Sequence, residues 1–150
     1  MAQQNVVVLG ATGSIGANTL DVMARHPDRY RLHAVTAATK VELMVDICML
    51  HRPRYAVMSN LASAQDLAHR LAAAGSRTEV LGGADMLVEV ARAAEVDVVM
   101  AAIVGAAGLA PCLAAARAGK RLLLANKEAL VVGADLFMAA VKAGGATLLP

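Results

Sequence analysis

The sequence predicts an α/β fold: a doubly wound, mostly parallel sheet of about seven strands with helices on both faces. Short β-branched runs alternate with longer helical patterns, which is typical of repeated βα units. Several of these runs are apolar without alternation, as expected for strands that are covered on both faces. Glycine or proline punctuates the helical patterns, which supports the same division of the chain.

The short β-branched runs mark the predicted strands. We expect seven of them, at residues 5–9, 31–36, 55–58, 78–81, 96–101, 121–125 and 146–149. Helical patterns separate them, at residues 15–25, 41–51, 62–74, 84–94, 109–118 and 130–143. Helix-ending residues follow five of the helices, namely Pro27, Pro53, Gly75, Gly119 and Gly144, and Pro111 suits the first turn of a helix.

Composition limits the function classes. The 150 residues are 58% hydrophobic and 17% charged, which excludes disorder and fits one domain that fills the chain. The net charge of +2 comes from scattered basic residues, so nucleic-acid binding gains no support. The longest apolar stretch, residues 101–116, is interrupted by Gly105, Gly108 and Pro111, so it is not expected to span a membrane.

The isolated Cys and His residues suggest no metal or redox site. Cys48 and Cys112 fit neither a redox pair nor a zinc spacing, so we expect small buried side chains. With no signal-peptide pattern at the N-terminus, a reducing cytoplasm is the expected location. The single histidines are expected at helix ends or on the surface (His26, His33, His51 and His69), and Asp97 and Asp135 are expected to be solvated.

A glycine-rich loop follows the first strand in the segment VVVLGATGSIG, residues 6–16. Gly10 would permit a tight turn, Gly13 would let backbone N–H groups approach a pyrophosphate, and Gly16 would let the next helix pack closely. Hydroxyl groups of Thr12 and Ser14 either bond a phosphate or cap the helix. This context predicts a Rossmann-like dinucleotide site; the alternative is a glycine-rich turn without a ligand.

The end of the second strand indicates which dinucleotide binds. Domains that bind NAD usually carry an acidic residue here for the ribose 2′-hydroxyl. Residues 31–41 contain no acid and instead offer Thr36, Thr39 and Lys40, which would suit a 2′-phosphate. We therefore predict NADP(H) over NAD(H), with a merely solvated Lys40 as the alternative.

Two later segments also contain the end of a predicted strand, where the crevice of the sheet is expected. Residues 100–111 carry small residues from the fifth strand into its helix, which would let a flat cofactor lie close, although helix–sheet packing alone could require the same residues. The segment LLLANKEAL, residues 122–130, places three polar residues after the sixth strand. Asn126 could bond a ribose or amide, Lys127 a substrate anion and Glu128 the cofactor. Alternatively, Asn126 caps the next helix, Glu128 complements its dipole and Lys127 is solvated.

Four segments together resemble 1-deoxy-D-xylulose 5-phosphate reductoisomerases of the bacterial type. They are GATGSIG at 10–16, TLDV at 19–22, AAIVGAAGL at 101–109 and LLLANKEAL at 122–130, and RTEVL at 77–81 and residues 136–150 also fit. The resemblance implies that NADPH is contacted by Thr12, Gly13, Ser14, Ile15, Ala38, Thr39, Lys40, Asn126 and Glu128, and that Lys127 reaches the substrate. Members often have a Gly followed by basic or amide residues where this chain has Ala38, Thr39 and Lys40.

The resemblance also implies a reaction. The family isomerises 1-deoxy-D-xylulose 5-phosphate and reduces the product with NADPH to 2-C-methyl-D-erythritol 4-phosphate, in non-mevalonate isoprenoid biosynthesis, with Mg or Mn as Lewis acid. The family's metal-binding D-S-E segment would follow Pro150. We therefore expect residues 1–150 to form the NADPH-binding domain, without catalytic or metal ligands and inactive alone. The family is homodimeric.

Two other readings remain. One is the nucleotide domain of another two-domain dehydrogenase, such as a semialdehyde dehydrogenase, which can share a GATG loop. The segment ANKE at 125–128 and the missing acid after the second strand argue against it. The other is a non-enzymatic nucleotide-sensing module, which would not be expected to end on a strand at residues 146–149.

Overall fold

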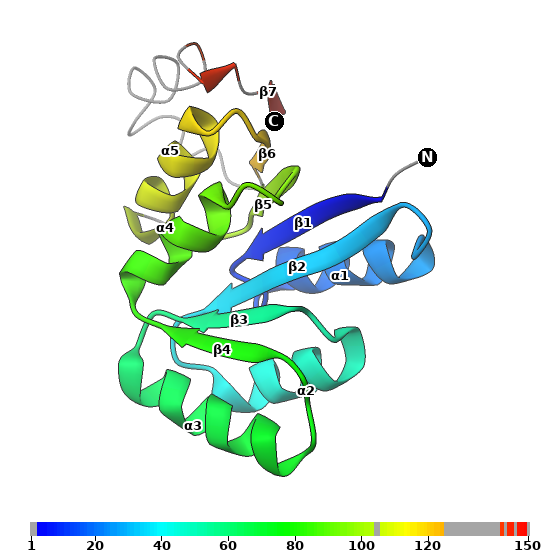
Figure 1. Ribbon diagram of the computed structural model, residues 1–150, viewed down its shortest axis with the longest axis vertical. Helices are drawn as coiled ribbons and strands as arrows, with labels where there is room; N and C mark the ends of the chain where they lie inside the picture. Colours follow the sequence, from blue (N-terminus) through cyan, green and yellow to red (C-terminus); the bar gives the residue numbers. More distant parts are fainter. Residues whose placement is uncertain (1–2, 104–105, 125–141, 143, 146, 150) are drawn as a thin grey trace.

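A computed structural model of the chain describes residues 3–103, 106–124, 142, 144–145 and 147–149 (Figure 1). One sheet has the strand order β4-β3-β2-β1-β5-β6-β7, and every neighbouring pair is parallel. The strands are β1 (Gln4–Leu9), β2 (Tyr30–Ala37), β3 (Tyr55–Met58), β4 (Glu79–Gly82), β5 (Val98–Ala101), β6 (Arg121–Leu124) and β7 (Thr147–Leu149). The predicted parallel α/β sheet is confirmed.

Helices cover both faces of this sheet (Figure 1). The three helices α1, α2 and α3 lie on one face, and α4 and α5 lie on the other. Their bounds are α1 (Ser14–Arg25), α2 (Val41–His51), α3 (Leu61–Ala73), α4 (Ala84–Arg92) and α5 (Leu109–Arg117), and a 3₁₀ turn spans Ala106–Gly108. The helix expected at 130–143 falls almost entirely outside the described residues. Within the described part, no helix is both long and apolar enough to cross a membrane.

Two apolar cores result, one on each face of the sheet. Strand β1 contributes to both, because Val6 and Val8 point to one face while Val7 and Leu9 point to the other. Cys48 belongs to the first core and Cys112 to the second, and both are buried. Burial raises the pKa of each thiol to about 12. The prediction that these cysteines are small buried side chains is confirmed.

The strand order reverses direction at β1. The chain moves from β1 outward through β2 and β3 to β4, and then returns to β5 on the other side of β1. The carboxyl ends of β1 and β5 therefore border the point at which the two halves of the sheet diverge, where ligands of open α/β sheets bind. The backbone N–H of Ala102 donates to the carbonyl of Leu9 over 2.8 Å, which holds the two strand ends together.

His33 departs from the expectation of a surface histidine. Its side chain is only 4% exposed, in the middle of β2. Val6 pairs with Leu32 and Val7 pairs with Ala34, so His33 is the extra residue of a β-bulge. Its ring packs against Tyr55, with centroids 5.2 Å apart, and burial lowers its pKa. The expectation was wrong because a β-bulge cannot be recognised from the alternation of apolar and polar residues along a strand.

Asp97 is exposed, as expected, but it also has a structural role. Its carboxylate accepts a hydrogen bond of 2.8 Å from the backbone N–H of Asn5. The side-chain amide of Asn5 in turn donates to the carbonyl of Glu95 over 2.8 Å. These contacts join the beginning of β1 to the turn before β5. Asp135 lies outside the described residues.

Candidate nucleotide site

The loop after β1 lies against the segment after β5, and Gly10 makes this possible. Its φ of +80° lies in the left-handed region that favours glycine. A Cβ at this position would lie 2.9 Å from the carbonyl carbon of Ala102 and 3.0 Å from the nitrogen of Ile103. Both are backbone atoms that cannot rotate away. Gly10 therefore forms the tight turn that the sequence predicts, at the point where the strand order reverses.

Gly16 has a different reason to lack a side chain. It is buried in the first turn of α1, and a Cβ there would lie 2.5 Å from the carbonyl oxygen of Gly10 and 2.7 Å from the Cα of Ala11. The helix can begin this close to the loop only because residue 16 is a glycine. This is the packing role that the sequence predicts for it.

Gly13 has no such requirement within the described protein. The nearest atom to a Cβ at this position is the carbonyl oxygen of Gly10, at 4.0 Å. Its φ of −83° and ψ of 172° suit any residue. The residue is also exposed, as are Ser14 and Ile15, whereas Thr12 is half-buried. The space above Gly13 is therefore open to a ligand, as expected for a glycine that lets a backbone approach a pyrophosphate.

The N-terminus of α1 is open as well. Gly13 is its N-cap residue, and no side chain caps the helix. The alternative in which Thr12 or Ser14 caps the helix is therefore wrong. The first turn of α1 contains no acidic residue, so the partial positive charge of the helix end is not neutralised from within that turn. Such a helix end is a suitable place for an anion.

The loop after β2 provides the second part of the site. Ala38, Thr39 and Lys40 are all exposed, at the same sheet edge as the glycine loop. The loop is held by its backbone, because Asn60 N–H donates to the Ala38 carbonyl over 3.3 Å and Val41 N–H donates to the Thr39 carbonyl over 2.9 Å. Lys40 precedes α2 as its N-cap residue. Its exposed side chain therefore leaves the backbone at the start of a helix.

Thr36 does not face the site, although the sequence predicts that it meets the 2′-phosphate together with Thr39 and Lys40. Its side chain is fully buried, and its Oγ1 accepts a hydrogen bond of 3.0 Å from the backbone N–H of Gly10. Its carbonyl accepts a second one, of 2.8 Å, from Ala11 N–H. Thr36 therefore joins the glycine loop to the end of β2. A hydroxyl within an apolar strand was the signal that could have indicated this role.

A hollow of about 600 Å³ borders the loop after β2. Lys40 and Thr39 line one side of it, and Ser63 and Asp66 of α3 line another. Asp66 accepts a hydrogen bond of 3.0 Å from Arg70, so its charge is partly balanced. The hollow is large enough for part of a nucleotide.

The segment after β5 serves packing as well as access. A Cβ on Gly108 would lie 3.2 Å from the Cβ of Ile103, so the small residue there is explained by the contact between this segment and the 3₁₀ turn. Gly105 lies outside the described residues. At Gly108, this tight contact with Ile103 favours the packing interpretation.

Comparison with known proteins places this geometry in a family. A family model described as 1-deoxy-D-xylulose 5-phosphate reductoisomerase matches residues 6–134, which is most of the chain. The chain belongs to this family. A relative of that name from Aromatoleum aromaticum is 63% identical over 147 residues, which are 98% of this chain and 36% of the relative. One from Pseudomonas putida is 59% identical over 149 residues, or 99% of this chain and 38% of the relative.

Solved structures agree with this assignment. The reductoisomerase from Zymomonas mobilis in complex with NADPH has a TM-score of 0.92 and 46% identity, and the match covers 99% of this chain and 38% of that one. A reductoisomerase with NADPH, fosmidomycin and magnesium has a TM-score of 0.93 and 46% identity, covering 98% and 36%. The homoserine dehydrogenase of S. aureus, at 14% identity and a TM-score of 0.61, shares the fold alone. The other-dehydrogenase reading is therefore not favoured.

The structure brings together part of the residue set expected for a reductoisomerase. The glycine loop and the residues 38–40 lie at one sheet edge, after the neighbouring strands β1 and β2. Asn126, Lys127 and Glu128 lie outside the described residues. Strand β6, which precedes them, ends at Leu124 beside Ala101 of β5, and Ala101 pairs with Leu9 of β1.

The described residues bring no cluster of metal-binding side chains together. Among the residues that the structure describes, no three His, Cys, Asp or Glu side chains form a group that could hold a metal ion. The described residues therefore do not fit the divalent ion that the family uses, and no chemical step through a metal is assigned to them.

Proposed function

We propose that this chain is the NADPH-binding domain of a 1-deoxy-D-xylulose 5-phosphate reductoisomerase. The observation that carries the proposal is the glycine loop at the reversal of strand order, where Gly10 and Gly16 are required by the fold while Gly13 is not. A ligand that lies against the backbone gives Gly13 a reason to be a glycine. The chain spans 36% to 38% of the length of the relatives described above, so the activity of the whole protein is part of the proposal.

The pyrophosphate would lie against the start of α1. The exposed backbone around Gly13, Ser14 and Ile15 would donate hydrogen bonds to it, with help from the hydroxyl of Thr12. The uncapped and non-acidic first turn of α1 supports this role. Its partial charge would complement the negative charge of the pyrophosphate.

The 2′-phosphate would lie at the loop of Ala38, Thr39 and Lys40. A lysine ammonium and a hydroxyl are suitable donors for a phosphate, and the backbone hydrogen bonds of this loop hold it in place without using either side chain. The sequence has no acidic residue from 31 to 41 that would favour the free 2′-hydroxyl of NAD. NADPH is therefore the proposed cofactor.

Three further residues complete the proposed set. Asn126 and Glu128 would contact the nicotinamide end of the cofactor, and Lys127 would meet the phosphosugar substrate. In the whole enzyme, 1-deoxy-D-xylulose 5-phosphate would be isomerised and reduced to 2-C-methyl-D-erythritol 4-phosphate. Mg or Mn, when bound, would polarise the substrate carbonyl, and we propose that its ligands follow Pro150 in the longer protein. The whole, longer protein is proposed to be cytoplasmic and homodimeric.

Side-by-side calorimetric titration with NADPH and NADH tests the proposal. We expect NADPH to bind more tightly, and Lys40→Ala to weaken NADPH by about tenfold while leaving NADH unchanged, because only NADPH carries the phosphate that Lys40 would meet. Equal or tighter binding of NADH would contradict the cofactor assignment. Reductoisomerase turnover by the isolated 150 residues would contradict the assignment of the catalytic machinery to the rest of the protein.

A further inference from the structure

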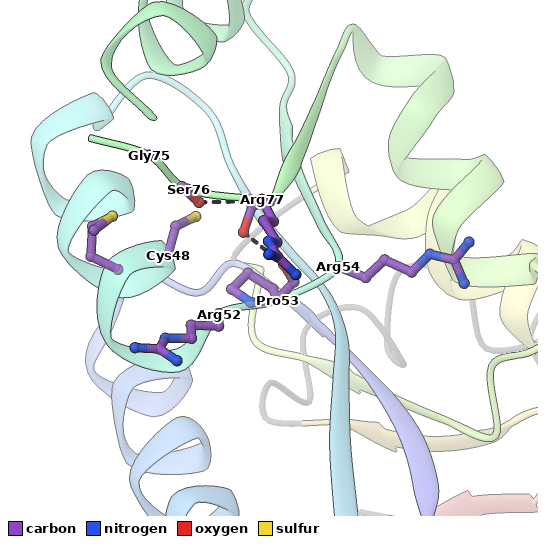
Figure 2. Close-up of a pocket in the computed structure, with 9 residues that line it drawn as sticks. Cys48, Arg52, Pro53, Arg54, Gly75, Ser76 and Arg77 are labelled. Atoms are coloured by element: carbon purple, nitrogen blue, oxygen red, sulfur yellow. Dashed lines mark hydrogen bonds between the residues drawn. The ribbon is translucent and has the colours of Figure 1, made fainter. Parts of the chain in front are cut away.

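A second cavity lies at the amino ends of the strands, whereas the glycine loop lies at their carboxyl ends. It has a volume of about 580 Å³ and is bounded by the end of α2, the loop before β3 and the loop before β4 (Figure 2). Its lining includes Met49, Arg52, Pro53, Arg54, Ser76 and Arg77. The segment RTEVL, residues 77–81, begins here and has no part in the proposed cofactor site.

Hydrogen bonds fix the two loops that form this cavity. The hydroxyl of Thr78 donates to the carbonyl of Pro53 over 2.7 Å, and the N–H of Glu79 donates to the carbonyl of Arg54 over 3.0 Å. The N–H of Thr78 donates to the hydroxyl of Ser76 over 3.2 Å. The cavity is therefore formed by the fold itself and does not require loops to close.

Two arginines supply unbalanced positive charge. Arg52 and Arg77 are exposed, on the two loops, and neither forms an ion pair within the part of the chain that the structure describes. Elsewhere in that part, Arg25, Arg70 and Arg92 each pair with an acidic residue of the same helix. These two arginines therefore keep their donors available for an anion.

Arg54 has a different arrangement. Its guanidinium lies over the ring of Tyr55, 5.2 Å from the centroid, and Figure 2 shows that it extends away from the two loops. The part of Arg54 that is nearest the backbone borders the cavity. The charge of this site therefore comes from Arg52 and Arg77.

The backbone of Arg52 is also unusual. Its φ of +51° makes it the only non-glycine residue with positive φ among the described residues. It ends α2, and its N–H donates to the carbonyl of Cys48 over 3.0 Å. A left-handed conformation is unfavourable for a residue with a side chain. Arginine occupies a position where glycine would be easier, and it lines the cavity there.

We infer that this cavity binds a small molecule carrying a phosphoryl group. Two guanidinium groups are suited to phosphate oxygens, and the Ser76 hydroxyl, which accepts from Thr78, still has a proton to donate. Met49 and the buried Pro53 offer an apolar surface to the rest of the molecule. The volume lies within the range of small-molecule sites. This inference does not depend on the cofactor assignment, because the two sites lie at opposite sheet edges.

The test is a titration of the isotopically labelled chain with phenyl phosphate and with inorganic phosphate, followed by amide NMR. We expect phenyl phosphate to shift the amides of residues 52–54 and 75–78 and to bind more tightly than inorganic phosphate, because only the former uses the apolar wall. In the double variant Arg52→Gln with Arg77→Gln, binding should weaken by about tenfold or more. Both side chains are exposed, so the variant should keep the wild-type spectrum elsewhere.

Arg121→Gln is the matched control. Arg121 is an exposed arginine that begins β6, at the same sheet edge but four strands away from β3. Removing its charge should leave phenyl phosphate binding unchanged. Shifts confined to residues 10–16, no saturable shift at all, or equal weakening by Arg121→Gln would each overturn the inference. The first of these results would still be compatible with the nucleotide site.

Discussion

Gly13 and Gly16 lie three residues apart, yet an added methyl group should affect them differently. At Gly13 the methyl group has 4.0 Å of clearance from the nearest protein atom, so Gly13→Ala should fold normally. It should weaken NADPH binding by about tenfold, because the methyl group occupies the space proposed for the pyrophosphate. At Gly16 it would meet backbone at 2.5 Å, so Gly16→Ala should destabilise the fold by about 1–3 kcal/mol.

Urea unfolding and calorimetry on the two variants separate these effects. Wild-type affinity in a normally folded Gly13→Ala would show that the pyrophosphate does not lie against Gly13. Gly16→Ala serves as the control for structural damage, since any loss of binding there should accompany a loss of stability.

His33 gives stability a specific dependence on pH. Burial lowers its pKa from the ordinary value of 6.5, partly offset by the charge of Glu95. The folded state therefore takes up a proton less readily than the unfolded state, so stability is complete above about pH 6.5 and falls as the pH drops below it. His33→Phe, which keeps a ring against Tyr55, should reduce this fall.

Urea midpoints measured between pH 7.5 and 5 provide the check. Burial also lowers the pKa of His51, so the variant should retain part of the fall. Replacement of the exposed His69 by Phe is the control. A pH profile of His33→Phe identical to that of the wild type would refute the role assigned to the buried ring.

Residue roles could be predicted from the sequence only where local geometry determines them. Gly10 and Gly16 follow a strand and begin a helix, and that context alone requires a close approach of the backbone. Thr36 could not be assigned in the same way, because its partner Gly10 is 26 residues away and only the tertiary fold brings them together. The bulge at His33 likewise depends on the register between two strands.

At the scale of elements, Thr36 links the loop after β1 to the end of β2. Thr36→Val keeps the shape of the side chain but leaves the N–H of Gly10 without its acceptor at 3.0 Å. We expect a loss of about 1–3 kcal/mol in the free energy of unfolding, because a part-buried donor becomes unsatisfied. NADPH affinity should fall as well, since the glycine loop is less firmly positioned.

Thr36→Ser is the matched control for that change. It keeps the hydroxyl and loses a methyl group, so affinity for NADPH should remain near the wild-type value even if stability falls slightly. Denaturation in urea and calorimetric titration measure the two quantities separately. If Thr36→Ser lost as much affinity as Thr36→Val, the positioning role of the hydroxyl would be refuted.

Where the structure describes an element, its bounds agree with the predicted ones to within two residues, and the differences have local causes. Strand β5 begins at Val98 rather than at residue 96, because Val96 N–H donates to the Ala93 carbonyl in a turn. Helix α4 ends at Arg92, two residues early, since Ala93 has already turned to a ψ of 142°. Apolar character marks Val96 and Ala93 as buried or partly buried, but it does not indicate where pairing starts or a helix stops.

At the scale of the whole molecule, the two cores should unfold together. Every second residue of β1 faces the core that contains Cys48, and the residues between them face the core that contains Cys112. Neither core can lose β1 without exposing the other. The chain should therefore unfold in one cooperative transition, as small single domains usually do.

The two thiols can report this transition, one for each core. Both are buried, and their raised pKa of about 12 keeps them protonated, so a disulfide reagent at pH 8 should react with neither in the folded chain. The variant Cys112→Ala leaves only the Cys48 thiol, and Cys48→Ala leaves only the Cys112 thiol. In each variant, we expect the remaining thiol to become reactive at the urea concentration at which the helical signal of that variant is lost. NADPH at a hundred times its dissociation constant should stabilise both variants equally, by about 2.7 kcal/mol. If Cys48 reacted well before the helical transition, the two faces would unfold independently. If NADPH protected one thiol alone, the nucleotide site would stabilise only one of the two faces.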